Sequence, residues 1–403
     1  MSVAALLAEH GSPLWLADVD RARERLAGFR GAWSAVWPDV EISYSYKTNR
    51  TTALLRAFAD EDAGAEVVCA AEYALARDVV GVQGARVTVN GPAKPDALLA
   101  RCAADGALVI ADSAAELERL ALAGVARVGV RVGLPGPEGH ASRFGIAPAD
   151  VVAAGRRARD LGLTLEVLSV HLVSTDFTAA LGSESERDRT LAANVRVGWA
   201  KPPAVHVQAA TVLARLAAEL GITTIDLGGG FPAAPAVAEH AAAVADALRR
   251  EQFDGRVLLE PGRALVADAV DLALTVVAVK TLADGTVCAV VDGGTDLLPG
   301  ALWAWPRLEA LTPRAGDAPT LVAGPLCLNI DVVAPAAPLG ELAVGDVLVA
   351  RGVGAYQQVQ STQFGDLRPA VVARDGGTWR LARRREELSD LIISDREEAP
   401  WSA

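Results

Sequence analysis

A single lysine, Lys47, directly follows the short β-branched and aromatic segment 42–46. Removing an ammonium group from water is costly, so a lysine at the end of a buried strand is unfavourable unless something compensates. One compensation is a lowered pKa and a covalent role, for example a Schiff base with an aldehyde cofactor. The alternative is a side chain that reaches the strand end and has no chemical role. This stretch alone favours the alternative, and the rest of the chain reverses that preference.

A triple glycine, residues 228–230, follows the apolar segment 222–225. Consecutive glycines let backbone N–H groups converge on an oxyanion, as helix N-termini do. An ordinary flexible turn is the competing interpretation.

A third segment, Glu-Pro-Gly-Arg at 260–263, follows the apolar residues 257–259. Its acid and its arginine either pair with each other or serve opposite ends of one ligand.

Together these groups match what pyridoxal 5′-phosphate (PLP) requires. A lysine forms the imine, and glycines with an arginine hold the phosphate. A carboxylate near the pyridine nitrogen keeps that nitrogen protonated, which makes the ring a strong electron sink.

The elements that would position these groups follow a regular alternating pattern from about residue 41. Short apolar runs alternate with amphipathic segments rich in Ala, Leu and Arg. The expected strands are 42–46, 65–68, 87–90, 108–110, 127–132, 165–173, 222–227 and 256–260. Eight strands alternating with helices favour a (β/α)8 barrel over an open sheet, and catalytic groups then gather at the C-terminal strand ends. No G-x-G-x-x-G turn follows the first strand, as a dinucleotide-binding fold would need.

After about residue 264 the helical segments become few and the short strands are bounded by Pro, Gly and Asp. This pattern predicts a C-terminal all-β domain. We expect a barrel over residues 35–265 and a β-rich domain made of 1–34 together with 266–403.

Composition excludes several functional classes for this chain of 403 residues. The net charge of −12 argues against binding nucleic acid or anionic membranes. No apolar run approaches the ~20 residues of a membrane span, and the N-terminus lacks a signal-peptide pattern. We therefore expect a cytoplasmic protein. The four cysteines and five histidines show no metal-ligand or disulfide spacing, so no metal is expected.

The motifs from Tyr-Lys-Thr-Asn at 46–49 to Gly-Ala-Tyr at 354–356 occur in an order and spacing that resemble one family across nearly the whole chain. The chain resembles the fold type III PLP-dependent decarboxylases, in particular the ornithine/diaminopimelate decarboxylase family. That family has an alanine racemase-like fold. The resemblance implies cofactor contacts from Lys47, Glu66, Arg131, His171, Ser174, Gly228, Gly229, Gly230, Glu260, Gly262, Arg263 and Tyr356.

Within this set the resemblance implies specific roles. Lys47 forms the imine, His171 stacks on the ring, Ser174 and Tyr356 contact the phosphate, and Glu260 faces the pyridine nitrogen. In the second domain, Gly-Pro-x-Cys at 324–327 implies that Cys327 reaches the partner subunit's site and handles the Cα proton. The resemblance thus implies a homodimer with shared active sites and an amino-acid substrate. The implied catalytic residues are Lys47, Cys327, His171 and Glu260.

The residue after the cysteine departs from the family pattern. In ornithine and diaminopimelate decarboxylases an acid at this position binds the distal amine of the substrate, and here it is Leu328. Asp331 and Asp292 remain as possible carboxylates, and Trp303 is a candidate for shaping a larger or more apolar pocket. A site built to bind an ammonium group rejects analogues that lack it. Conversely, a site without that acid should bind substrates with a distal ammonium poorly. We therefore expect decarboxylation of a non-standard, modified or carrier-linked amino acid.

Two other functions are compatible with the same fold. An amino-acid racemase would place an arginine at the pyridine nitrogen, where this chain has Glu260. A catalytically inactive regulatory homologue would tend to lose cofactor-binding residues, which are present here.

Overall fold

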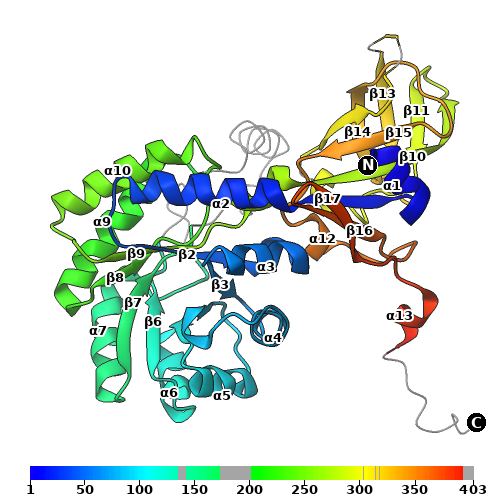
Figure 1. Ribbon diagram of the computed structural model, residues 1–403. Helices are drawn as coiled ribbons and strands as arrows, with labels where there is room; N and C mark the ends of the chain where they lie inside the picture. Colours follow the sequence, from blue (N-terminus) through cyan, green and yellow to red (C-terminus); the bar gives the residue numbers. More distant parts are fainter. Residues whose placement is uncertain (135–141, 173–200, 303, 314, 317, 394–403) are drawn as a thin grey trace, which may run out of the picture. The chain divides into compact units, whose positions relative to one another are not determined.

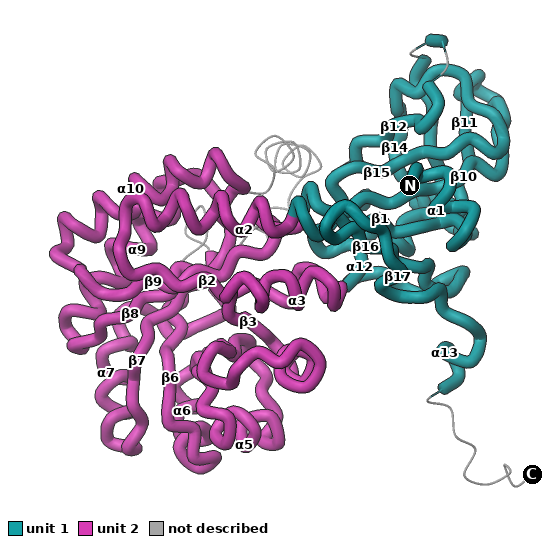
Figure 2. The backbone as a smooth tube through the Cα atoms, viewed as in Figure 1, with its two compact units in different colours: residues 1–21, 267–403 teal, residues 22–266 magenta. Residues whose placement is uncertain are grey.

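The computed structural model describes residues 1–134, 142–172, 201–302, 304–313, 315–316 and 318–393. The chain divides into two compact units (Figure 2), one of Met1–Arg21 with Ala267–Ala403 and the other of Ala22–Val266. Each unit is described separately below.

Eight parallel strands close into a barrel in the second of these units (Figure 1). They are β2 (Val40–Ser45), β3 (Gly64–Val67), β4 (Val87–Val89), β5 (Leu108–Ala111), β6 (Arg127–Arg131), β7 (Thr164–Ser169), β8 (Thr224–Asp226) and β9 (Arg256–Leu259). Each strand pairs with the next, and β9 pairs with β2, so the sheet has no edge. The predicted (β/α)8 barrel is therefore confirmed.

Helices connect the barrel strands. They are α2 (Val19–Ser34), α3 (Thr52–Asp60), α4 (Ala70–Ala74), α5 (Asp96–Asp105), α6 (Ala114–Leu122), α7 (Pro148–Asp160), α9 (Pro203–Leu220), α10 (Val237–Arg250) and α11 (Arg263–Val266), with short turns η1 (Tyr46–Thr48), η2 (Leu75–Val80) and η3 (Gly84–Arg86). Each barrel strand is short and mostly buried, as expected where helices cover a parallel sheet. On α10 the buried positions Val237, Ala241, Val244 and Leu248 recur at helical spacing, so one stripe of this helix faces the core.

The other unit is built on a nine-stranded sheet. Its strands are β1 (Leu14–Asp18), β10 (Val270–Thr281), β11 (Val287–Val291), β12 (Arg307–Ala310), β13 (Pro319–Ala323), β14 (Val332–Pro338), β15 (Val347–Arg351), β16 (Ala370–Asp375) and β17 (Thr378–Arg383). The main path runs β14-β13-β11-β10-β1-β16-β17, and β15 joins β10 to β12. Helices α1 (Val3–His10), α12 (Gln357–Gln360) and α13 (Leu388–Ile392) and the turns η6 (Ala267–Ala269) and η7 (Pro299–Leu302) complete this unit.

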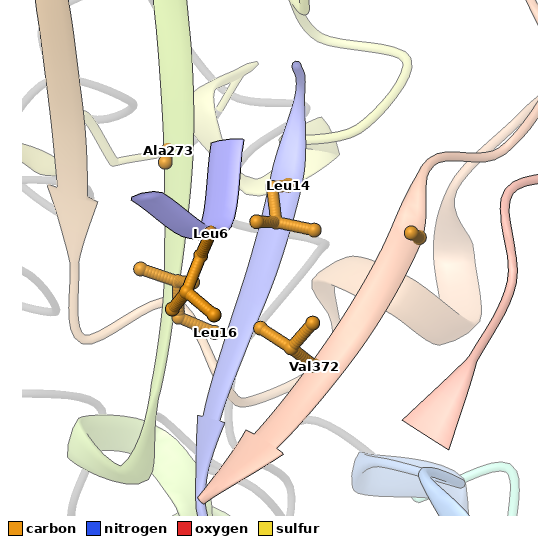
Figure 3. Close-up of a cluster of buried hydrophobic side chains, with 6 residues drawn as sticks. Leu6, Leu14, Leu16, Ala273 and Val372 are labelled. Carbon is orange, nitrogen blue, oxygen red and sulfur yellow. The ribbon is translucent and has the colours of Figure 1, made fainter. Parts of the chain in front are cut away.

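The N-terminal segment is part of this sheet, because β1 pairs antiparallel with β10 and parallel with β16. Leu14 and Leu16, on one face of β1, pack with Leu6 of α1 and with Ala273 and Val372 of the neighbouring strands (Figure 3). Alternate strand residues point to one face, so this spacing buries Leu14 and Leu16 together. Hydrophobic burial thus anchors the start of the chain to strands from its second half.

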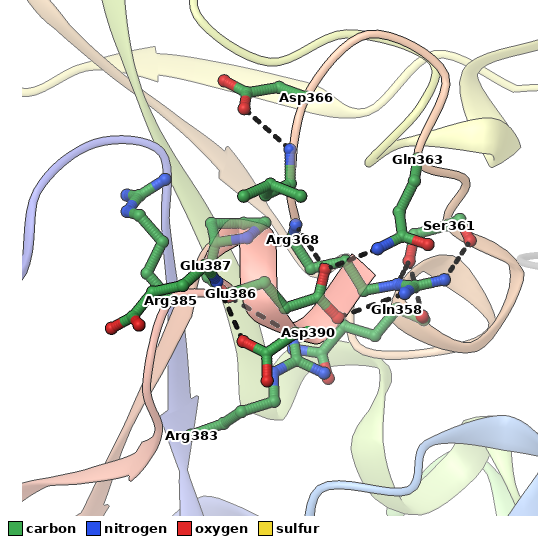
Figure 4. A network of polar contacts seen from close by, with 12 residues as sticks. Gln358, Ser361, Gln363, Asp366, Arg368, Arg383, Arg385, Glu386, Glu387 and Asp390 are labelled. Carbon is green, nitrogen blue, oxygen red and sulfur yellow. Dashed lines mark hydrogen bonds and ion pairs between the residues drawn. The ribbon is translucent and has the colours of Figure 1, made fainter. Parts of the chain in front are cut away.

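A polar network holds the chain after Tyr356 (Figure 4). The Glu386 carboxylate accepts hydrogen bonds from Arg368 N at 2.9 Å, Arg368 Nη1 at 3.2 Å and Gln363 Nε2 at 2.8 Å. The Arg368 guanidinium also reaches Ser361. These bonds tie the segment 361–368 to the residues after β17.

The boundary near the N-terminus differs from the expected one. We expected residues 1–34 in the β-rich domain, whereas the compact units divide after Arg21. The physical reason is that most of α2 packs on the barrel unit. Phe29 and Trp33 make edge contacts with the Phe231 ring, with centroids 5.9 and 5.5 Å away. In the part of the chain that the structure describes, no helix has the length and apolar character needed to cross a bilayer.

Candidate active site

Lys47 lies on the short turn η1, directly after the first barrel strand. Its neighbours Tyr46 and Thr48 are buried, whereas the lysine side chain remains 27% exposed. The Lys47 Nζ atom is 2.5 Å from Glu66 Oε2. This is the C-terminal end of a barrel strand, where catalytic groups collect in such folds.

Glu66 is a fully buried carboxylate on β3, opposite Ser45 in the strand register. Besides Lys47, it accepts hydrogen bonds from Ser45 Oγ at 2.6 Å and Asn90 Nδ2 at 3.2 Å. Burial alone would raise the pKa of Glu66, but the charge of Lys47 and the hydrogen bonds from Lys47 and Ser45 outweigh it, so the pKa lies below its ordinary value. Glu66 is therefore an anion that holds the lysine ammonium in place.

Glu260 lies just after β9 and is 1% exposed. Its Oε1 atom accepts a hydrogen bond from Asn90 Nδ2 at 2.7 Å. Within the described residues its Oε2 atom has no hydrogen-bond partner. His171 Nδ1 lies 3.8 Å from it, and the Asp226 carboxyl is also close enough to interact with Glu260. A buried carboxylate oxygen without a partner is costly, so this atom is suited to receive a donor from a ligand.

The triple glycine at 228–230 passes close to His171 and Glu260. A Cβ atom on Gly228 would lie 2.4 Å from Val170 O and 3.0 Å from His171 Nδ1, and one on Gly229 would lie 2.9 Å from Glu260 O. Gly228 and Gly230 also adopt φ of +61° and +89°, which favour glycine. The turn is therefore a backbone cradle without side chains, and it lies next to His171 and Glu260.

Gly262 joins the Glu-Pro-Gly-Arg corner to the lysine turn. A Cβ atom there would lie 2.0 Å from Thr48 Oγ1 and 3.3 Å from Ser45 Cβ. The Ser45 N–H also donates to Pro261 O at 3.2 Å. Because β2 and β9 are barrel neighbours, the turn that carries Lys47 lies beside the corner that follows Glu260, although the two are far apart in the sequence.

Arg131 ends β6 and is 9% exposed. Its Nη1 atom donates to Asp112 Oδ1 at 3.1 Å, and its guanidinium lies 4.5 Å from the centre of the Phe144 ring. Behind Asp112, the Glu116 carboxylate accepts the Asp112 N–H and also accepts a hydrogen bond from the buried Lys94 ammonium, which braces this loop. Arg131 is thus a fixed cation at the C-terminal end of the barrel, as its predicted cofactor role requires.

In the β-rich unit, Asp331 organises the loop that carries Cys327. Its carboxylate accepts hydrogen bonds from Thr295 N at 2.7 Å, Thr295 Oγ1 at 3.0 Å and Leu326 N at 2.8 Å. Asp331 is 2% exposed, whereas Cys327 is exposed and Leu328 is 42% exposed. Both oxygens of Asp331 are thus used inside the unit, which does not favour its predicted contact with substrate.

Asp292 and Tyr356 lie in the same unit. Asp292 Oδ1 accepts the Thr275 N–H at 2.8 Å, and burial raises the pKa of Asp292, opposed by a hydrogen bond from Ser12. Tyr356 has a φ of +69°, which is rare for a bulky residue and is found where function requires strain. This backbone conformation supports a functional role for Tyr356. Ser174 and Trp303, also predicted to be site residues, lie outside the described residues.

Comparisons with known proteins identify the family of this chain. The model of the family described as "Pyridoxal-dependent decarboxylase, C-terminal sheet domain" matches residues 18–354. The chain belongs to this family. It is 30% identical to the diaminopimelate decarboxylase of Deinococcus radiodurans, over 96% of each chain. It is 33% identical to that of Actinosynnema pretiosum subsp. auranticum, over 96% of this chain and 89% of the relative.

A solved structure shows the same fold. The diaminopimelate decarboxylase from M. jannaschii, in a co-complex with L-lysine, superposes with a TM-score of 0.85 at 21% identity. The match covers 98% of this chain and 94% of that one. The predicted class of enzyme, a PLP-dependent amino-acid decarboxylase, is confirmed by the family.

The residues present fit PLP by two independent observations of this structure. Glu260 Oε2 is a buried acceptor with no partner in the described chain, which suits a protonated ring nitrogen. At Gly228 and Gly229 a Cβ atom would collide with Val170 O and Glu260 O, so this turn beside His171 and Glu260 carries no side chain of its own, as a backbone N–H cradle for an oxyanion requires. Lys47, Glu260, His171 and the glycine turn all belong to the barrel unit.

Sequence reasoning missed three residues of this site. Asn90 contacts both Glu66 and Glu260. Asp226 is fully buried, and burial together with the charge of Glu260 raises its pKa well above the ordinary value. His206 stacks on Phe231 with ring centroids 3.9 Å apart, and its Nε2 lies 3.2 Å from Gly229 O, while burial lowers its pKa to about 3. Asn90 ends the expected strand 87–90, and Asp226 is the second-last residue of the expected strand 222–227; this position near a strand end was the available signal.

Proposed function

We propose that this chain decarboxylates an amino acid on a PLP held by Lys47, and that the substrate lacks the distal ammonium group used by its relatives. The observation that carries the first part is the 2.5 Å contact of Lys47 with Glu66, which Asn90 links to Glu260, whose Oε2 has no hydrogen-bond partner among the described residues. The observation that carries the second part is Leu328 on the exposed loop next to Cys327.

When bound, PLP supplies an aldehyde for an amine and a ring that accepts the electrons released as CO2 leaves. Glu66 keeps the Lys47 Nζ atom oriented at the end of β2. Glu260 would accept the ring N–H at Oε2, and a carboxylate there would keep that nitrogen protonated. The His171 ring and the glycine turn define the adjoining face and the phosphate end. Arg131 and Arg263, which belong to the barrel unit, would add contacts to the cofactor.

After CO2 leaves, a proton must be returned to Cα. Lys47 Nζ is one donor on this chain. The other is Cys327 of the partner subunit in a homodimer with shared sites, and the exposure of Cys327 on its own unit supports this assignment.

This chain differs from the family pattern at position 328, where the family's acid binds the distal end of the substrate. Asp331 and Asp292 were the two carboxylates that could replace the acid missing at position 328. Asp331 uses both oxygens to hold its loop, and Asp292 binds the Thr275 N–H. Neither is therefore well placed to bind a distal ammonium, which supports a non-standard, modified or carrier-linked amino acid.

Diaminopimelate is the second candidate, because the two relatives at 30% and 33% identity are named for its decarboxylation. An assay of CO2 release over a panel of free, modified and carrier-linked amino acids distinguishes the two. Efficient turnover of diaminopimelate or ornithine would refute the proposed substrate class. Loss of optical activity without CO2 release would instead indicate a racemase.

A variant pair tests the role of the loop. Leu328→Asp restores an acid where the relatives have one, and we expect it to increase turnover of substrates with a distal ammonium. Ile330→Asp, also on the exposed part of the loop, is the matched control and should not. An equal effect of both variants would show that position 328 is not a specificity determinant.

A further inference from the structure

Asn90 connects the two carboxylates that face the opposite ends of the proposed cofactor site. It directly follows β4, and its N–H donates to Val67 O at 2.8 Å, which fixes its backbone to β3. Its side chain is turned inward, and the residue is 8% exposed. The amide nitrogen Nδ2 lies 3.2 Å from Glu66 Oε1 and 2.7 Å from Glu260 Oε1.

The barrel order shows why this connection is unusual. Glu66 belongs to β3, a neighbour of β4, but Glu260 follows β9, which is separated from β4 by β2 and β3. Asn90 therefore spans three neighbouring strand pairs at the C-terminal end of the barrel. No backbone pairing joins β4 to β9 directly, so the contact with Glu260 depends on the Asn90 side chain.

The chemistry of the amide suits this place. Glu66 and Glu260 are nearly fully buried, and Asp226, a third carboxylate, lies close enough to interact with Glu260. Buried carboxylates need hydrogen-bond donors, and an amide NH2 provides two without adding charge. Because both of its partners are acceptors when ionised, the Asn90 nitrogen rather than its oxygen must face them.

The contact also selects the oxygen that Glu260 presents. Asn90 uses Oε1, which leaves Oε2 without a hydrogen-bond partner in the described residues. A carboxylate that could rotate would offer a ring N–H either oxygen in several orientations. A carboxylate held through one oxygen offers the other in a fixed direction, which reduces the ordering cost of binding.

We propose that Asn90 is a positioning residue shared by Glu66 and Glu260, and that it directs Glu260 Oε2 toward the ring nitrogen of PLP. This inference rests on the proposed role of Glu260. The groups facing this cluster are Lys47 after β2, Glu66 on β3, His171 after β7, Asp226 on β8 and Glu260 after β9.

The test measures the affinity of the full-length protein, freed of cofactor, for PLP by titration of absorbance and fluorescence. Asn90→Ala should weaken binding about tenfold or more, the loss expected for one hydrogen bond to a charged group. In a Glu260→Gln background the same substitution should have little further effect, because its target has lost the charge. Such non-additivity shows that two residues act together.

Ser45→Ala is the matched control, because Ser45 donates to Glu66 at 2.6 Å and has no recorded contact with Glu260. Its effect on affinity should add to that of Glu260→Gln. If Asn90→Ala does not fold, Asn90→Ser serves instead, because one short hydroxyl cannot supply both carboxylates. Circular dichroism and unfolding in urea verify the fold of each variant.

Three outcomes would overturn the inference. Wild-type PLP affinity in both Asn90 variants would show that the amide does not position Glu260. Effects of Asn90→Ala and Glu260→Gln that simply add would show that Asn90 acts elsewhere. Wild-type affinity and absorbance in Glu260→Gln would instead refute the assigned role of Glu260, and the inference would fail with it.

Discussion

Asp331→Asn should loosen the loop that carries Cys327 and Leu328. The carboxylate accepts hydrogen bonds from Thr295 N, Thr295 Oγ1 and Leu326 N, at 2.7, 3.0 and 2.8 Å. An asparagine keeps one acceptor oxygen and replaces the other with an NH2 group. If the oxygen stays with Thr295, the NH2 faces the Leu326 N–H, so two donors oppose each other at a buried position.

The magnitude follows from these contacts. A hydrogen bond to a charged group contributes about 1.5–3 kcal/mol, and an unsatisfied buried donor costs about 1–3 kcal/mol. Because these terms overlap, we expect Asp331→Asn to lower the free energy of unfolding of the β-rich unit by about 2–4 kcal/mol.

Two measurements check this expectation. Urea unfolding, followed by tryptophan fluorescence and circular dichroism, gives the loss of stability. Hydrogen exchange gives the local effect, and the Leu326 amide should exchange faster because its acceptor is gone. Alkylation of Cys327 should also become faster, as the loop that holds it opens more often.

Asp284→Asn is the control, because Asp284 accepts the Thr286 N–H on an exposed turn and the substitution should change stability little. An Asp331→Asn protein with wild-type stability and wild-type exchange at Leu326 would refute the reasoning. It would also reopen the predicted role of Asp331 in binding substrate.

Two further predictions concern the barrel unit. Gly262→Ala places a Cβ atom 2.0 Å from Thr48 Oγ1, so we expect about 1–3 kcal/mol of destabilisation and weaker PLP binding in titrations. Thr48→Ala should partly rescue it, and no rescue would show that the strain lies elsewhere. Burial and the charge of Glu260 raise the pKa of Asp226, so the folded protein binds its proton more tightly than the unfolded chain does. This stabilisation is fully present below the ordinary pKa and is lost as the pH rises through the raised value. Asp226→Asn should therefore gain stability relative to wild type as the pH rises above about 4, measured by urea unfolding of the PLP-free protein. Equal pH slopes in both proteins would contradict this.

The alternation of strands and helices, and the change of rhythm near residue 264, allowed the fold to be predicted from sequence. Short apolar runs bounded by glycine and charge are a local signal, and the barrel strands differ from the expected ones mainly at their ends. The segment expected as a strand over 165–173 illustrates this, because β7 ends at Ser169. His171, which follows β7, lies at the C-terminal end of the barrel rather than on a strand.

The partners of the site residues were harder to predict. Lys47 could be singled out because a lone lysine after an apolar strand is costly. Nothing in the sequence near Asn90 shows that it reaches Glu260, because this contact depends on the closure of the barrel between β9 and β2. Asp331 was predicted to bind substrate because an acid near Cys327 suggests it. Its hydrogen bond from Thr295 comes from 36 residues away in the sequence, so it depends on the tertiary fold and could not be read from the local sequence.

The role of Lys47 is tested most directly by locating the covalently bound cofactor. The protein is incubated with PLP, reduced with borohydride, digested, and analysed by mass spectrometry. The account predicts one stable pyridoxyl adduct on the peptide that contains Lys47, and none in Lys47→Ala. An adduct on another lysine, such as Lys94 or Lys201, or an unmodified Lys47 peptide despite CO2 release, would contradict it.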